Sequence, residues 1–388
     1  MQIEELAQGR YILWGANWSL YTGKVRPYLI KKGIDYIELN PSHPHFHAGV
    51  VPQIGHITVP VVEASDGGII ADSTEIMLYF EASHPENSMI PDNPVMAALA
   101  WVLHNFGSEG LLKPAMHYRW NTLEENRPFI VDEFSRSLQI KAEREQAEKT
   151  VGLTYAEHIW EYLPILGVGD ANTAAIERST HQLYAILNAH FLAYPYLLGG
   201  SPSIADFGLM APVYAHLGRD PSSNSELKLE APALYRWIET MGRAPIMDPE
   251  LWYVPPGFFS SDELPGTLTN LLAFVAADYG PEMMATARAY EQWLPGKSSG
   301  DIVSHNGEKA NHQVLGEVEH VQQGDIIKHG AFLDVLTLHQ HVTAVVDTMS
   351  EAELGQYETI MRAAGGGDIF ELRLPAALVR NNYAWVLV

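Results

Sequence analysis

Hydrophobic positions in the first third of the chain alternate between strand-like and helix-like spacing. Short apolar runs at 11–16 and 34–40 predict two strands, and the stretch 25–33 between them predicts the end of a helix. Further strands are expected at 57–64 and after the Asp-Gly-Gly turn that follows, and a helix is expected over 73–85. The predicted order is β-α-β, a linker, and then β-β-α.

The middle of the chain changes to helical spacing. From Asn93 to about Gly242, apolar residues recur every three or four positions, which is typical of amphipathic helices around a common core. Ser203 and Asp206 stand three residues apart just before an apolar run, so they predict a capping box at the start of a buried helix. A connector rich in Pro and Gly, 244–266, follows this region.

Helical patterns continue toward the C-terminus. They cover 267–278 and 281–294, and another long amphipathic stretch covers 325–349. Ser350 then stands three residues before Glu353, which again predicts a capped helix.

The length of the chain indicates several structural parts. At 388 residues it exceeds what one hydrophobic core usually supports. We therefore expect an α/β domain at 1–85, an all-helical domain at 93–245, and a mostly helical C-terminal extension at 246–388 whose role the sequence does not indicate.

Composition narrows the chemistry and the compartment. The chain has no cysteine, which excludes disulfides, thiolate metal sites and mechanisms that use a protein thiol. Its net charge of −23 disfavours binding to nucleic acid or to an anionic membrane, because both rely on clustered Lys and Arg. The N-terminal segment matches neither a secretory signal nor a transit peptide, and no apolar run is long enough to cross a membrane. These features predict a cytoplasmic protein.

Three features of the first domain are candidates for a binding site. Ser19 follows the opening strand and precedes a helix, where backbone N–H groups and the helix dipole favour an anion. The Val59–Pro60 bond enters a strand, so the proline must lie at an edge or be cis, and a cis bond would present the Val59 backbone to an extended peptide. Asp72 and Ser73 open the last helix, where Ser73 can hold a carboxylate while Asp72 meets an ammonium group.

In combination these motifs resemble the glutathione transferase superfamily. The stretch WSLYTGKVRPYLIKKGIDY, then TVPVV and ADSTEI, is similar to its N-terminal domain, and SIADF is similar to the capping motif of its helical domain. The resemblance covers roughly residues 11–245. It implies a thioredoxin-like α/β domain plus an all-α domain, a homodimer, and glutathione as co-substrate.

The resemblance also implies site residues. Ser19 takes the place of the family's catalytic hydroxyl, Val59 pairs with the cysteinyl backbone of glutathione beside Pro60, and Asp72 with Ser73 holds its γ-glutamyl end. Because the chain lacks cysteine, branches that form a mixed disulfide through a protein thiol are excluded and a serine-type transferase remains. The activated sulfur would attack an apolar small-molecule electrophile, which is the chemistry of detoxification.

Several assignments stay open at this stage. His56 is the leading choice for the glycyl carboxylate, because the segment before Pro60 is longer here than in the family. Tyr21 and Asn17 are the fallback donors to the sulfur. The electrophile pocket is expected to include aromatic and imidazole side chains, at Tyr21, Trp101, His104, His117 and Tyr118.

A metal site and other activities are the remaining alternatives. His43, His45 and His47 alternate, but Pro44 interrupts them and no carboxylate accompanies them, so no metal is expected. A binding or scaffold protein that keeps the fold without turnover is the main rival function. Glutathione-dependent isomerisation or ether cleavage would use the same thiolate. The extension could restrict the cleft, form an oligomer surface or recruit a partner.

Overall fold

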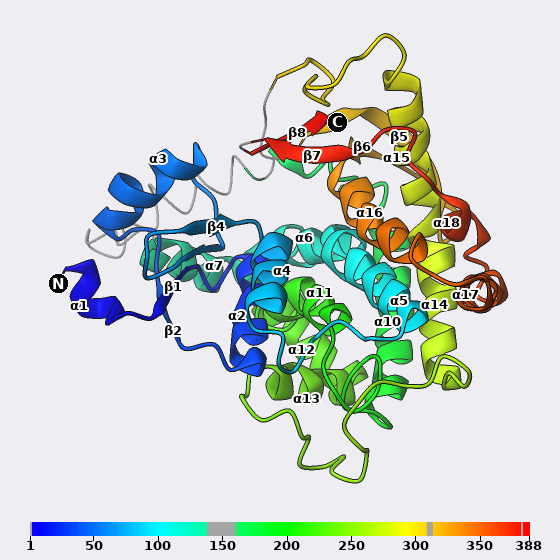
Figure 1. The fold of residues 1–388 in the computed structure, drawn as a ribbon, viewed down its shortest axis with the longest axis horizontal. Coiled ribbons are helices and arrows are strands. Elements are labelled where there is room, and N and C mark those ends of the chain that lie inside the picture. The colour runs from blue at the N-terminus through cyan, green and yellow to red at the C-terminus, as the bar shows by residue number, and fades with distance from the viewer. Residues whose placement is uncertain (1, 138–158, 160, 309–312, 382) are drawn as a thin grey trace.

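The computed structural model describes residues 2–137, 159, 161–308, 313–381 and 383–388. Figure 1 shows the N-terminal domain at one side, a helical region in the centre, and the C-terminal extension beside both. The N-terminal domain contains four strands, four α-helices and a short π-helical turn: α1 (Ile3–Ala7), β1 (Tyr11–Trp14), α2 (Leu20–Lys32), β2 (Tyr36–Leu39), η1 (Phe46–Val50), α3 (Val51–Ile54), β3 (Val61–Glu63), β4 (Ile69–Ala71) and α4 (Ser73–Ser83).

The four strands form one sheet in the order β2-β1-β3-β4, with β1 and β2 parallel and the other pairs antiparallel. Successive side chains of β1 point to opposite faces, as a strand requires. Leu13 packs with α2 and α4 in the main core, while Ile12 and Trp14 pack with Phe46 in a second cluster under η1. The predicted order β-α-β, linker, β-β-α is confirmed, and the fold is the expected thioredoxin-like one.

The central region is helical, as predicted. Its elements are α5 (Pro94–Asn105), η2 (Phe106–Gly110), α6 (Leu112–Trp120), α7 (Leu123–Ser137), α10 (Thr173–Phe191), α11 (Ile204–Pro212), η4 (Val213–Leu217), α12 (Pro221–Glu230) and α13 (Pro232–Met241). The predicted capping box is confirmed, because the Asp206 carboxylate accepts from Ser203 N at 2.9 Å. Helix α11 packs against both α2 and α5, so it joins the first domain to the helical one.

The extension is mainly helical but also contains two hairpins. Its elements are α14 (Gly266–Asp278), α15 (Gly280–Trp293), β5 (Val314–Gln322), β6 (Asp325–Phe332), α16 (Asp334–Val346), α17 (Glu351–Ala363), α18 (Gly367–Glu371), β7 (Leu378–Asn381) and β8 (Ala384–Leu387). The amphipathic stretch 325–349 is therefore a strand followed by a helix. The capping box at Ser350 is confirmed.

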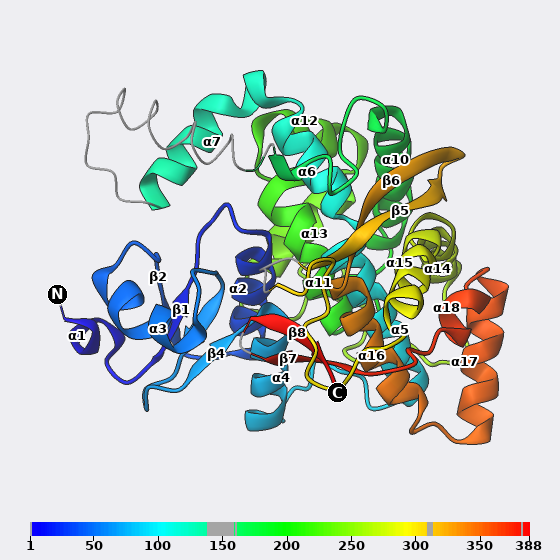
Figure 2. The same ribbon diagram turned by 90° about the horizontal axis from the view of Figure 1, so that it is seen from above.

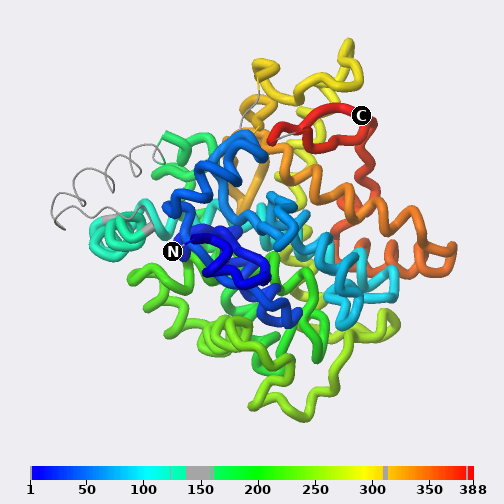
Figure 3. Tube along the Cα trace, turned by 60° about the vertical axis from the view of Figure 1, so that its left-hand side comes forward, coloured from blue at the N-terminus to red at the C-terminus, as the bar shows by residue number. Residues whose placement is uncertain are grey.

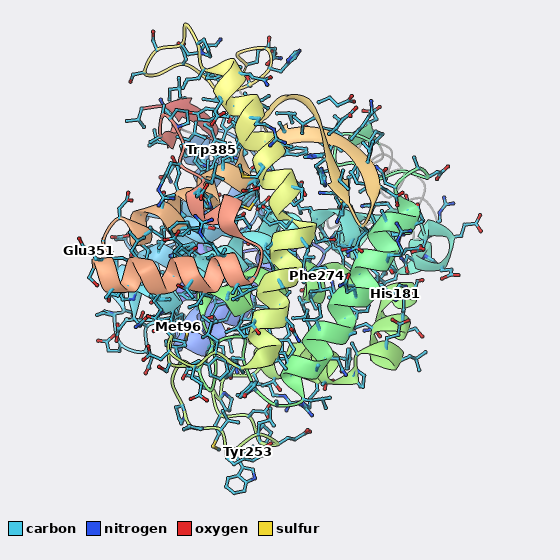
Figure 4. All side chains as sticks on the ribbon, turned by 90° about the vertical axis from the view of Figure 1, so that its right-hand side faces the viewer. Met96, His181, Tyr253, Phe274, Glu351 and Trp385 are labelled. Carbon is cyan, nitrogen blue, oxygen red and sulfur yellow. The ribbon has the colours of Figure 1, made fainter. Side chains whose placement is uncertain are left out.

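The extension shares its core with the helical domain. Helices α16 and α17 pack against α5, and the tube of α16 runs beside α5 in Figure 3. Figure 4 shows α14, which carries Phe274, standing next to α10 on the opposite side from α17. One continuous cluster of buried apolar side chains includes members from all three parts of the chain. In the part of the chain that the structure describes, no helix is both long and apolar enough to span a membrane.

Candidate functional site

Ser19 occupies the N-cap of α2. Its Oγ accepts a hydrogen bond from Thr22 N at 3.2 Å, and the residue is 7% exposed. The loop before it is held by two arginines of the helical domain, since Arg119 donates to Trp18 O at 2.9 Å and Arg219 donates to Asn17 O at 2.7 Å. Ser19 thus has the expected place at a helix N-terminus, where the dipole favours negative charge.

The Val59–Pro60 peptide bond is cis, as predicted. The pair precedes β3, which begins at Val61 and lies in the middle of the sheet between β1 and β4. Both residues line a cavity that also reaches the start of α4.

Asp72 and Ser73 mark the start of α4. Asp72 is the N-cap, and its Oδ1 accepts from Thr74 N at 2.8 Å and from Glu75 N at 3.5 Å. Its φ of 79° lies in the left-handed region, which is uncommon for a residue with a side chain and is typical of functional sites. Ser73 is buried but reaches the same cavity.

The cavity that these residues line has a volume of about 300 Å³. One wall comes from the N-terminal domain and the other from the extension, through α16 and the β7–β8 hairpin. Figure 2 shows this hairpin lying beside β4 and the start of α4. The lining residues are Tyr21, Lys24, Ile54, His56, Thr58, Val59, Pro60, Ala71, Asp72, Ser73, Thr74, Glu75, Glu109, Asp334, Thr337, Leu338, His341, Arg380, Tyr383 and Trp385.

Buried charged groups are among the residues that line the cavity. Lys24 is buried and donates to Thr74 Oγ1 at 3.0 Å, and burial lowers its pKa to about 8. The Tyr21 hydroxyl donates to Glu109 Oε1 at 3.1 Å. Burial, with the charge of Asp334 as the next cause, raises the pKa of Glu109 well above its ordinary value. Burial likewise raises the pKa of Tyr21, so its phenol stays neutral.

His56 lies in the cavity wall on the N-terminal side. Its Nδ1 is 3.1 Å from Ile54 O, and because a carbonyl only accepts, Nδ1 carries the proton. The neutral ring therefore presents Nε2 as an acceptor, and it can bind a carboxylate only when protonated. Burial lowers the pKa of His56, so this protonation requires a more acidic solution. Tyr383 of the extension packs over the ring, with centroids 4.6 Å apart.

Not every residue that the sequence suggested for catalysis or for the substrate pocket lines the cavity. Tyr21 does, but Ser19, which was expected to be the catalytic hydroxyl, does not. Trp101 stacks on His341 of α16, with ring centroids 4.3 Å apart. It therefore packs against a residue that lines the cavity. His104 is buried and contacts Ile204 O at 2.8 Å.

His117 and Tyr118 lie on α6 and are buried away from the cavity lining, and His117 contacts Glu177 at 3.2 Å. The structure therefore brings together Tyr21, His56, the cis-proline pair and the Asp72–Ser73 pair.

Candidate metal ligands lie elsewhere. His45 pairs with Glu63 at 2.9 Å. Within the described ranges, one group brings three ligand atoms within 4.8 Å of one another, and it consists of His181, Glu226 and Glu230 on α10 and α12. This group does not line the cavity.

Comparison with protein families gives a match over the first domain. Residues 13–88 match the model described as "Glutathione S-transferase, N-terminal domain". The first domain is therefore similar in sequence to the N-terminal domain of glutathione S-transferases. A search of curated protein sequences found no match.

Several solved structures are similar to this chain at low identity. The beta-etherase LigF of Sphingobium sp. strain SYK-6 is 20% identical, with 61% of this chain and 96% of that chain covered and a TM-score of 0.43. GSTFuA3 of Phanerochaete chrysosporium is 19% identical over 62% and 98%, with a TM-score of 0.40. A glutathione S-transferase of Ceriporiopsis subvermispora in complex with glutathione is 19% identical over 64% and 99%, with a TM-score of 0.38.

Lys24, Glu109 and Arg380 are among the charged lining residues of the cavity that the sequence motifs do not predict. The sequence could have indicated Lys24, because this residue lies near the buried Val25 and Tyr28 on α2, where a charged side chain is unusual. No sequence pattern indicates Glu109 or Arg380, because each reaches the cavity through packing between distant segments.

Proposed function

We propose that the protein is a glutathione transferase that binds glutathione in this cavity and conjugates its thiolate to an apolar electrophile. The observation that carries the proposal is the meeting of Val59, cis-Pro60, Asp72 and Ser73 on one wall of a single cavity. An extended tripeptide needs backbone pairing at its centre and charged contacts at its ends, and this wall offers both. Apolar surface for an aryl ring comes from Ile54, Leu338 and Trp385.

Two groups support ionisation of the glutathione sulfur. Lowering a thiol pKa from ~8.5 by about two units requires roughly 2.7 kcal/mol of preferential binding to the thiolate. A hydrogen bond from Ser19 to the thiolate would contribute ~1.5–3 kcal/mol, and the dipole of α2 would add ~0.3–1 kcal/mol. The Lys24 ammonium group lines the same cavity and favours an anion there.

The rival function is glutathione binding without turnover. It is favoured by one observation, which is that Ser19 is nearly buried, already accepts a hydrogen bond from Thr22 N, and does not line the cavity. The two functions share the binding wall and differ only in whether the sulfur is activated.

Retention on immobilised glutathione and a chromogenic aryl-halide assay test both functions. We expect the parent protein to be retained and to turn over the aryl halide, and Ser19→Ala to be retained with a rate about 10- to 100-fold lower. Retention without turnover by the parent protein favours the binding protein, and absence of retention refutes the proposed site.

Ser350→Ala is the matched control for this experiment. Ser350 is also an N-cap serine, and it accepts from Glu353 N at the start of α17 without lining the cavity. Loss of either cap costs about 1 kcal/mol of stability. If both variants lose turnover equally, the effect of Ser19→Ala comes from capping and the catalytic role is wrong.

The assembly and the compartment are further parts of the proposal. We expect a homodimer in the cytoplasm, on the basis of the resemblance to the superfamily. Light scattering coupled to size-exclusion chromatography measures the mass of the assembly in solution. A mass equal to that of a single chain at all concentrations would contradict the homodimer.

A further inference from the structure

The extension contributes a cation to the part of the cavity where the γ-glutamyl end of glutathione would lie. Arg380 is on β7, and its Nη2 lies 3.3 Å from Asp72 Oδ2. Asp72 uses its other oxygen, Oδ1, to cap α4. The carboxylate is therefore fixed on one side by the helix and faces the guanidinium on the other.

Arg380 is held in place but is not fully paired. Its guanidinium carbon lies 4.2 Å from the centroid of the Trp385 ring, which orients the planar group. Its contacts with Asp72 and, at 3.5 Å, with Asp334 Oδ1 both use the same nitrogen, Nη2. Its Nε is buried and has no hydrogen-bond partner among the described residues. A buried charged donor without an acceptor is costly, and a bound carboxylate would remove this cost.

The two charges match the two charges of an α-amino acid. The γ-glutamyl end of glutathione carries an ammonium and a carboxylate on one carbon atom. Asp72 offers a negative charge, and Arg380 of the other wall offers a positive charge beside it, in the cavity that Ser73 also lines. A single-point contact of 3.3 Å leaves both groups able to take a second partner, whereas a bidentate pair would already satisfy both.

We propose that Arg380 binds the α-carboxylate of the γ-glutamyl end while Asp72 binds its ammonium group. The extension then completes the glutathione site in the same chain, and it selects a ligand that carries both charges. This inference rests on the proposed function, because it assumes that glutathione occupies the cavity.

Titration calorimetry with three tripeptides tests the inference on the full-length protein. The ligands are glutathione, glutaryl-Cys-Gly, which lacks the ammonium group, and 4-aminobutyryl-Cys-Gly, which lacks the α-carboxylate. We expect Arg380→Gln to weaken binding of glutathione by about 10-fold or more, as loss of a charge-assisted hydrogen bond implies. The same variant should bind 4-aminobutyryl-Cys-Gly as the parent protein does.

Two further variants keep the test decisive. Arg380→Lys retains the charge without the fork geometry, so it should restore part of the affinity and confirms that the fold tolerates changes at this position. Arg373→Gln removes a charge from the extension outside the cavity lining, where Arg373 donates to Phe370 O and Leu372 O, and it should bind all three ligands as the parent does.

The outcomes separate the two proposals. Glutathione binding by the parent protein that Arg380→Gln leaves unchanged would overturn the inference and leave the proposed function standing. Tighter glutathione binding by Arg380→Gln would also overturn it, because Arg380 would then compete with the ligand ammonium for Asp72. Absence of glutathione binding by the parent protein would overturn the proposed function and the inference together.

Discussion

The wall of the cavity formed by residues 54–75 and the wall formed by α16 and the β7–β8 hairpin differ in how their residues are brought together. In the first wall, cis-Pro60 and the Asp72–Ser73 pair lie within one supersecondary unit, and hydrogen bonds to the start of α4 fix their geometry. The second wall, which includes Asp334 and Arg380, reaches the first wall only because the extension packs on α5. The first wall depends on local structure, whereas the second depends on the whole molecule.

Removing the extension, and with it the second wall, should have the largest effect. We expect a chain that ends at residue 245 to aggregate, because the deletion uncovers the apolar face of α5. It also removes Glu282, the ion-pair partner of buried Lys113, and an unpaired buried charge is strongly destabilising. Size-exclusion chromatography measures the outcome. A monodisperse remainder that still binds glutathione would show that the first wall suffices by itself.

The sequence reveals the first wall because its signals are local. A proline entering a strand, an Asp-Ser pair opening a helix, and the capping boxes at Ser203 and Ser350 each depend on a few neighbouring residues. The second wall has no such signal. Arg380 and Asp72 are about three hundred positions apart, and their meeting depends on how β7 of the extension lies against the first domain, which no local pattern specifies.

The β5–β6 hairpin shows a different kind of error. Burial alternates along β5 from Glu317 to Val321, but the residue types do not follow it, because His320 is buried and Val321 is exposed. In β6, Ile327, His329 and Ala331 are buried. The apolar stretch of α16 follows β6 directly, so the two elements form one long amphipathic segment in the sequence. The boundary between a strand and a helix is hidden when no turn residue separates them.

Lys24 of α2, which lines the cavity on the side of the N-terminal domain, provides the next largest effect. Because Lys24 loses its proton as the pH rises through about 8, we expect kcat/KM of the parent protein to fall above that pH. Lys24→Gln should lower kcat/KM by about 10-fold near pH 7, as loss of a charge-assisted contact implies, and should abolish the falling limb. Lys328→Gln, at an exposed lysine of β6, is the control. A falling limb that persists in Lys24→Gln would assign it to another group.

Glu109→Gln tests the junction between the two walls. The pKa of Glu109 is raised in the folded state, so its ionisation opposes folding at pH values above its ordinary range, and this penalty vanishes near pH 4. The Gln carbonyl can still accept from the Tyr21 hydroxyl. We expect Tm at pH 7.5 to rise by about 2–4 °C, which corresponds to about 1 kcal/mol for a large domain. An equal rise at pH 4 would show that ionisation is not the cause.

Tyr383→Ala gives the smallest expected effect and tests the contact between Tyr383 of the second wall and His56 of the first. The Tyr383 ring covers His56, and burial is the main cause of the lowered His56 pKa. Removing the ring lets water reach the imidazole, so we expect the pKa of His56 to rise toward its ordinary value, as measured by NMR titration. If His56 holds the glycyl carboxylate when protonated, glutathione binding should then persist to a higher pH, with a change in affinity of a few-fold at most.

Tyr253→Ala, at an exposed tyrosine of the connector labelled in Figure 4, should leave the titration of His56 unchanged. An unchanged pKa in Tyr383→Ala would mean that residues of the first wall alone determine how His56 is buried.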